Sequence, residues 1–265
     1  MSYELQEHFD KLKSNLGTTD TKFGELCVYR ANTDSVTSTA LIGYGELYSA
    51  ELYMLSSYLK EESIFVDIGS NIGYRCVAIN QLTKCKVYGF EPNPDHFALS
   101  AFNCQNKPIK LFHTALSSAK GTVTLLNDIE VPCKKLDDIS ELSEKINVMK
   151  ITTNGHEFEI LKGSSKIIKK YRPVIMYQAM DLTVWSDCYT FLNSKQYKQY
   201  WVTCLTKPIG ENFKKSEEDL FGKAGVSSIL AVPEENMQPN DLVEVLAGED
   251  YSNMVQRLAN YKILF

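Results

Sequence analysis

The chain has 265 residues, 44% of them hydrophobic and 23% charged, with a formal net charge of −5. This is the composition of a globular protein, and the acidic balance disfavours nucleic-acid binding, which relies on clustered Lys and Arg. No run reaches the roughly 18 to 20 continuous apolar residues that a membrane span needs, so we expect no span. The N-terminus carries acids where a secretory signal is basic, and the seven cysteines form no C-x-x-C pair. We therefore expect a cytoplasmic protein with reduced cysteines and no zinc.

Taken in chain order, the first pattern is an amphipathic helix, because Leu5, Phe9, Leu12 and Leu16 recur at helical spacing. From residue 64 onward, short apolar runs alternate with stretches of helical period. This alternation predicts an α/β fold, a doubly wound and mostly parallel sheet with helices on both faces. Strands are predicted at 64–68, 86–90, 109–113, 146–151 and 173–177, with a small extra strand at 119–126. Helices are predicted at 72–82, 94–105, 156–170 and 183–195.

Two later apolar runs, 199–205 and 227–232, predict a terminal antiparallel pair with a long polar excursion between them. Nothing in the sequence marks a linker or an internal repeat, so we expect a single domain. It would comprise a helical cap segment (1–60), a Rossmann-like core (61–235) and a C-terminal helical extension (236–265).

The sequence FVDIGSNIGY, residues 65–74, follows the first core strand. In a doubly wound sheet this loop lies at the centre of the ligand crevice. A dinucleotide site normally shows G-x-G-x-x-G, and the carboxylate of Asp67 would repel a pyrophosphate. S-adenosylmethionine fits better, since its amino group and sulfonium are cationic and it has no phosphate. We expect Asp67, Gly69, Asn71 and Gly73 to bind it, with the glycines allowing close approach to the backbone. The alternative is that Asp67 only caps the turn.

The second core strand ends in Glu91, 24 residues after Asp67. An acid at this point can accept hydrogen bonds from both ribose hydroxyls of an adenosine ligand. The alternative is a surface acid before Pro92.

With these residues in view, the chain resembles the FkbM family of class I S-adenosylmethionine-dependent methyltransferases from about Gly45 to Pro233. The motifs that carry the resemblance are FVDIGSNIGY (65–74), VYGFEPNPDHFALSAFN (87–103), TALSSAKGTVTL (114–125), KKLDDI (134–139), KITTNGHEFEILKG (150–163), RPVIMYQ (172–178) and ILAVP (229–233). The resemblance implies a seven-stranded sheet whose last strand is antiparallel. It also implies methylation of a hydroxyl on a sugar, a glycan or a natural product.

The same resemblance extends the expected cofactor site beyond Glu91. Pro92 and Asn93 belong to the second-strand motif. Thr114, Ala115 and Leu116 follow the third strand and are expected to line the adenine pocket, although a strand-end turn also explains them. Glu51 lies in an acidic, aromatic stretch that in relatives can cover the methionine end of the cofactor, or it belongs to a helix packed on the sheet.

The chain departs from the family at the expected reaction edge. The usual motif K-I-D-V-E-G-H-E is here KITTNGHE, so Thr152 and Asn154 replace two acids, and Gln178 stands where relatives commonly carry Glu. A divalent metal would find too few carboxylates there, so we expect no metal. A carboxylate base is lost as well, which leaves His156 as the candidate proton acceptor.

Both His156 and its neighbours also have a structural interpretation. Asn154 and Glu157 have the spacing of a helix N-cap and its reciprocal partner, and capping is the favoured role of Glu157. For His156, catalysis and plain hydrogen bonding are equally open. The sequence thus favours a metal-independent O-methyltransferase. The alternatives are a cofactor-binding module without catalysis, suggested by the missing acids, and a nicotinamide-dependent oxidoreductase, which conflicts with Asp67.

Overall fold

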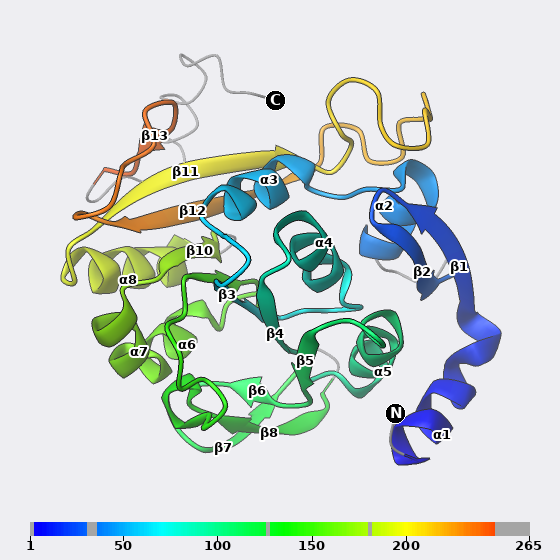
Figure 1. Ribbon diagram of the computed structural model, residues 1–265, viewed down its shortest axis with the longest axis horizontal. Coiled ribbons are helices and arrows are strands. Elements are labelled where there is room, and N and C mark those ends of the chain that lie inside the picture. The colour runs from blue at the N-terminus through cyan, green and yellow to red at the C-terminus, as the bar shows by residue number, and fades with distance from the viewer. Residues whose placement is uncertain (1–2, 31–35, 126–127, 180–181, 247–265) are drawn as a thin grey trace.

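An eight-stranded sheet forms the centre of the computed structural model, which describes residues 3–30, 36–125, 128–179 and 182–246 (Figure 1). Across the sheet the strand order is β13-β11-β12-β10-β9-β3-β4-β5. The strands are β3 (Ile64–Ile68), β4 (Lys86–Phe90), β5 (Ile109–Phe112), β9 (Val148–Ile151), β10 (Val174–Gln178), β11 (Tyr197–Leu205), β12 (Gly225–Pro233) and β13 (Val243–Glu244).

Strands β10, β9, β3, β4 and β5 are mutually parallel, and β12 runs antiparallel to both β10 and β11. The predicted seven-stranded core with an antiparallel last strand is thereby confirmed. The two-residue strand β13, which the sequence did not predict, pairs with β11 at the edge of the sheet. Strand β3 is buried along its whole length, as a central parallel strand between two helical layers must be.

Helices cover both faces of the sheet. One core cluster joins Phe65, Val87 and Met176 to the helices that follow the N-terminal strands, and the other joins Val66, Met149 and Ile175 to the later helices. On the first face lie α3 (Ser49–Ser57), α4 (Tyr74–Thr83) and α5 (Pro94–Asn103), and on the second lie α6 (Glu157–Gly163), α7 (Ser165–Tyr171) and α8 (Leu182–Asn193).

The predicted helix over 156–170 is in fact two helices. The break falls at Ser164, whose Oγ donates to the carbonyl of Ile160 at 2.7 Å. Beside it, Gly163 packs so closely on another loop that a Cβ there would lie 2.0 Å from the carbonyl oxygen of Ser117. The loop between β6 and β7 therefore packs tightly against the end of α6.

The N-terminal segment is only partly helical, which corrects the expected cap. Helix α1 (Tyr3–Leu12) and the short 3-10 helix η1 (Lys13–Asn15) lead into an antiparallel hairpin, β1 (Leu16–Thr21) with β2 (Gly24–Tyr29), before α2 (Val36–Tyr44). These residues are extended and pair antiparallel, from the pair Leu16 and Tyr29 to the pair Thr21 and Gly24, so they are not helical. Phe9, Leu26 and Leu41 belong to the same core cluster as the sheet.

A separate three-stranded sheet stands beside the core, in the order β6-β8-β7 (Figure 1). It consists of β6 (Ala115–Leu116), β7 (Gly121–Thr124) and β8 (Glu130–Lys134), followed by the 3-10 helix η2 (Leu136–Asp138). The predicted small strand at 119–126 is confirmed as β7.

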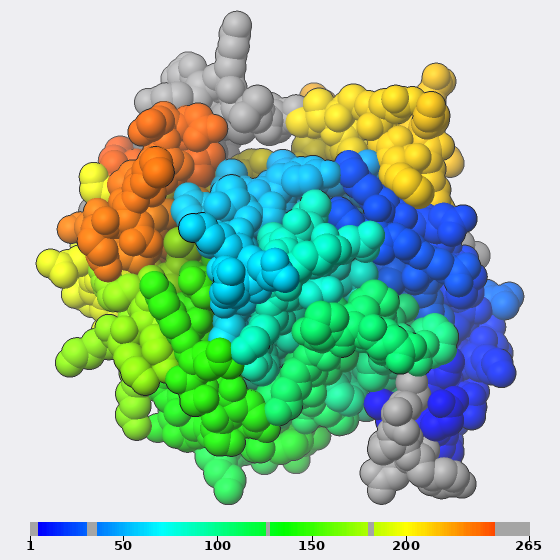
Figure 2. All heavy atoms as spheres, viewed as in Figure 1, coloured from blue at the N-terminus to red at the C-terminus, as the bar shows by residue number. Residues whose placement is uncertain are grey.

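The predicted C-terminal extension gives β13 within the described residues, and residues 247–265 lie outside them. The polar excursion between β11 and β12 lies beside the N-terminal elements, where Figure 2 shows its gold atoms against the blue ones. None of the helices in the described ranges is both long and apolar enough to traverse a membrane.

Candidate active site

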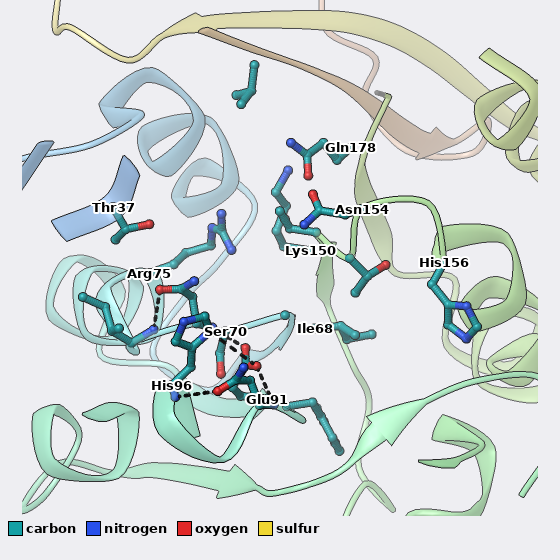
Figure 3. A pocket seen from close by; sticks show the side chains of 18 of the residues that line it. Thr37, Ile68, Ser70, Arg75, Glu91, His96, Lys150, Asn154, His156 and Gln178 are labelled. Atoms are coloured by element: carbon teal, nitrogen blue, oxygen red, sulfur yellow. Dashed lines mark hydrogen bonds and ion pairs between the residues drawn. The ribbon is translucent and has the colours of Figure 1, made fainter. Parts of the chain in front are cut away.

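A cavity of about 1190 Å³ opens at the C-terminal ends of β3, β4, β9 and β10. Ligands of doubly wound sheets bind at this edge, where loops from neighbouring parallel strands meet. The volume exceeds the roughly 300 to 1,000 Å³ of a typical small-molecule site, so two molecules have room. Figure 3 shows side chains that line it.

The glycine turn after β3 is shaped by its protein neighbours. Gly69 has φ +82°, and a Cβ there would lie 2.0 Å from the carbonyl oxygen of Thr152. Gly73 has φ +85°, and its Cβ would lie within 3.0 Å of side-chain atoms of Ser100 and Cys104. Gly69 lines the cavity, whereas Gly73 is not among its lining residues. Positive φ angles and close packing against the residue after β9 and against α5 therefore already require glycine at both positions.

Asp67 lies behind the cavity lining. It is 0% exposed, and its carboxylate accepts hydrogen bonds from Arg75 Nη1 at 2.8 Å and from the Cys76 thiol at 3.4 Å. Arg75, on the first turn of α4, does line the cavity. The sequence predicts that this carboxylate faces the ligand, whereas in the structure it is buried and paired with the guanidinium of Arg75, a residue without a predicted role.

Glu91 lines the cavity at the end of β4 and is 6% exposed. Its Oε2 accepts the backbone N–H of Asn71 at 2.7 Å, and its Oε1 accepts that of Asn93 at 2.9 Å (Figure 3). Burial raises the pKa of the Glu91 carboxyl to about 7, although these two hydrogen bonds act against the rise. The carboxylate is thus held in a fixed orientation by the turns after β3 and β4.

The residues around Glu91 complete this end of the cavity. Asn93 caps α5, its side chain accepting the backbone N–H groups of Asp95 and His96. Pro92 lines the cavity, as do Asn71 and Asn93. The lining also includes the predicted segment Thr114, Ala115 and Leu116, which pairs through β6 with the small sheet.

Thr152, Asn154 and Gln178, the neutral residues of the predicted reaction edge, all line the cavity. Gln178 is 8% exposed, and its Oε1 is buried without a hydrogen-bond partner in the described part of the chain. The hydroxyl oxygens of Thr152 and of Ser70, another lining residue, are also buried without a hydrogen-bond partner among the described residues. Buried polar atoms in folded proteins are nearly always paired, so these atoms fit a polar ligand that supplies the missing hydrogen bonds.

A buried charge network adjoins this edge, and sequence reasoning missed most of it. Lys150, 1% exposed, donates to Glu51 Oε1 at 2.7 Å and to Ser228 Oγ at 3.0 Å. Nη2 of Arg75 lies 3.9 Å from Glu51 Oε2. Burial by itself would raise the pKa of Glu51, but Lys150 and Arg75 hold it below its usual value. The only signal in the sequence was the acidic stretch containing Glu51.

His156 lines the cavity as the N-cap of α6 and makes no side-chain capping bond. Its Nε2 lies 3.1 Å from Ser117 Oγ. Figure 3 shows the imidazole away from Asn154 and Gln178, at the side of the cavity toward α6. The side chain is therefore held at the rim, with its ring oriented by Ser117.

Glu157 is the first residue of α6, and it binds the loop before the helix and not the N-cap residue, so the expected capping pair with Asn154 does not form. Its carboxylate accepts the backbone N–H of Thr153 and that of Gly155, each at 2.9 Å. The expected N-cap Asn154 is wrong, because it is exposed, has φ +54° and precedes the N-cap by two residues. Across the described ranges, no group of three or more His, Cys, Asp or Glu side chains is placed to hold a metal ion.

Comparison with known proteins bears on this geometry. Residues 110–198 match the family profile of the methyltransferase FkbM domain. Over 143 residues the chain is 32% identical to the hexuronic acid methyltransferase AglP of Haloferax volcanii, an alignment that covers 46% of this chain and 59% of that protein.

Solved structures show the same fold. A methyltransferase FkbM from Methylobacillus flagellatus superposes with a TM-score of 0.52 at 16% identity, covering 86% of this chain and 59% of that one. A SAM-dependent methyltransferase from Agrobacterium tumefaciens gives 0.53 at 7% identity, covering 83% and 71%. The chain thus spans 59% of the length of both AglP and the Methylobacillus protein.

Proposed function

We propose that the chain is a methyltransferase of the FkbM type and that it transfers a methyl group from S-adenosylmethionine to a hydroxyl of a sugar or sugar acid, since residues 110–198 match the FkbM domain profile and AglP is 32% identical over 143 residues. The observation that carries the proposal is the placement of Glu91. Its carboxylate lines the cavity at the end of β4, oriented by two backbone N–H groups. A carboxylate in this position can accept both hydroxyls of a ribose, and the nearby Asn71 and Thr114–Leu116 flank the space for the nucleoside.

The acceptor class is suggested by the relative that acts on a hexuronic acid. The side chains of the reaction edge are uncharged, which is compatible with an anionic sugar as acceptor. Thr152, Asn154 and Gln178 carry no charge, and Glu51 is bound by Lys150. A carboxylate on the acceptor would meet hydroxyl and amide groups there, and the charge of Glu51 beside them is balanced by Lys150.

We assign a separate role to each of the residues at the reaction edge and to His156. S-adenosylmethionine supplies an electrophilic methyl group on a positively charged sulfur. Gln178 and Thr152, whose buried oxygens have no partner among the described residues, bind a polar group of the acceptor other than the reacting hydroxyl. His156, which lies at the other side of the cavity (Figure 3), takes the proton of the reacting hydroxyl, with Ser117 fixing the orientation of its ring.

Calorimetry with S-adenosylhomocysteine and with NAD tests the cofactor. We expect micromolar binding of the former and none of the latter, and Glu91→Ala should weaken the binding by at least 10-fold, about the worth of one charge-assisted hydrogen bond. Binding of NAD alone would contradict the proposal.

Transfer is tested with radiolabelled S-adenosylmethionine and a panel of hexuronic acids and the matching neutral hexoses. We expect His156→Ala to lower kcat by about 10²- to 10⁴-fold with unchanged affinity for S-adenosylhomocysteine. His113→Ala, a histidine outside the cavity lining, is the matched control. Full turnover of His156→Ala would refute the assignment of the base. Cofactor binding without labelling of any acceptor would favour the alternative suggested by the lost acids, a binding module without catalysis.

A further inference from the structure

Directly after the glycine turn, the guanidinium of Arg75 on α4 lines the cavity. Asp67 is completely buried and absent from the lining, whereas Arg75 lines the cavity with 15% of its side chain exposed. Figure 3 shows this side chain extending from α4 toward the part of the cavity near Lys150 and Gln178. A ligand group that reaches the start of α4 therefore meets a guanidinium.

This guanidinium is held in place with donors to spare. Nη1 donates to Asp67 Oδ1 at 2.8 Å, and Nη2 lies 3.9 Å from Glu51 Oε2, which is beyond hydrogen-bond distance. These are the contacts of the guanidinium within the described ranges, so N–H groups on Nη2 and Nε remain for a ligand. Although burial acts against it, Asp67 and Glu51 raise the pKa of Arg75, so the side chain stays charged.

The surroundings of Arg75 favour an anion of a particular shape. The residue is the second of α4, and the positive end of the helix dipole adds to its own charge. A planar guanidinium fork matches a carboxylate or phosphate with two parallel hydrogen bonds. S-adenosylmethionine has no phosphate, and its one anionic group is the α-carboxylate of its methionine part.

We propose that Arg75 binds this α-carboxylate and that Asp67 acts as a positioning residue that holds Arg75. The inference rests on the proposed function and names the recognition of one end of its cofactor. It assigns to Asp67 an indirect role in binding, through the guanidinium in front of it. Fixing Arg75 before the ligand arrives lowers the entropy cost of binding.

Calorimetry with two probes tests this assignment: S-adenosylhomocysteine and its decarboxylated analogue, which lacks only the carboxylate. The wild-type chain should prefer the former by about 10- to 100-fold, the worth of a charge-assisted pair. Arg75→Met should lose that preference while the affinity for the analogue stays within about 2-fold. Arg75→Lys keeps the charge without the fork and should retain part of the preference.

Two further variants separate binding from folding. Arg75→Met leaves Asp67 buried without its partner, so Asp67→Asn with Arg75→Met removes both charges and should show the same lost preference in a folded chain. Asp67→Asn alone should reduce the preference less. Glu91→Gln is the control, because it should weaken both probes equally and leave the preference intact.

The outcomes against the proposal are distinct. An unchanged preference with both probes weakened by Arg75→Met and by the double variant would show a structural role only, and an unchanged preference with neither probe weakened would show that the carboxylate binds elsewhere. Either result overturns the inference and leaves the proposed function standing. A wild-type chain that binds neither probe would instead refute the proposed function.

Discussion

Glu91 has a raised pKa of about 7 because it is a buried carboxylate with only neutral hydrogen-bond donors. A carboxyl whose pKa rises on folding stabilises the fold below its ordinary pKa, near 4.5, and this contribution is lost as the pH rises through 7. Ribose hydroxyls that donate to the carboxylate favour the ionised form. Stability without ligand and affinity for the cofactor therefore change in opposite directions over this pH range.

We predict that the affinity for S-adenosylhomocysteine rises about 10-fold between pH 6 and pH 8, as the fraction of ionised Glu91 grows, and then levels off. Glu91→Gln should bind more weakly with no such rise. The variant should also be more stable than the wild type at pH 8 without ligand, by roughly 3 kcal/mol, and should lose this advantage near pH 4.5. Calorimetry and urea unfolding across the range measure both. An identical pH profile in the two proteins would contradict the prediction.

At the scale of elements, Asn103 joins three segments that are distant in sequence. From the end of α5 it donates to the carbonyl oxygens of Cys27 and Ile72 and accepts the backbone N–H of Cys27. Cys27 lies on β2 and Ile72 in the glycine turn, so one amide side chain fixes the hairpin against this turn. Asn103 is 4% exposed, and water cannot easily replace these bonds.

We predict that Asn103→Ala lowers the free energy of unfolding by about 2 to 4 kcal/mol, because it leaves three buried backbone groups unpaired. It should also weaken binding of S-adenosylhomocysteine, since the turn at 69–73 loses a support. Asn193→Ala, at an exposed position near the end of α8, is the control and should change stability by less than about 0.5 kcal/mol. Urea unfolding and calorimetry measure the two effects. Equal stability of the two variants would disprove the role of Asn103.

At the scale of the whole molecule, the excursion between β11 and β12 folds back on the N-terminal segment. The buried Tyr44 hydroxyl donates to the carbonyl of Glu218 and accepts the backbone N–H of Leu220 at 2.9 Å. Gly43 permits this contact, because a Cβ there would lie 2.2 Å from Leu220 Cδ1. Phe221 then lines the cavity. One wall of the cavity is thus assembled from segments more than 170 residues apart.

We predict that Tyr44→Phe speeds hydrogen exchange of the Leu220 amide by at least 10-fold, since that N–H loses its partner, with little change in the sheet. Tyr58→Phe, at the end of α3, is the matched control. Hydrogen-exchange mass spectrometry over peptides covering 213–224 gives the comparison. Unchanged exchange there would mean that other contacts hold this wall.

Much of this arrangement could be predicted from the sequence because it depends on neighbours along the chain. Short apolar runs predict the core strands and helical spacing predicts the helices between them. The carboxyl ends of neighbouring parallel strands meet at one edge, so the loops after Asp67 and at Glu91 were expected to converge. The hairpin β1–β2 escaped prediction because the apolar spacing of the first residues suggested helix. The break at Ser164 escaped because it depends on a hydrogen bond and on pressure from a loop elsewhere.

The sequence by itself determined the sheet, the site's location and the presence of acids at the ends of β3 and β4. Only the tertiary structure decided which charges face the ligand. Arg75 forms an ion pair with Asp67, and Lys150 forms one with Glu51, which is 99 residues away in the sequence. The physical reason is that periodicity reports whether a side chain is buried, whereas an ion pair depends on how α3 and α4 pack against the sheet, which local patterns do not encode.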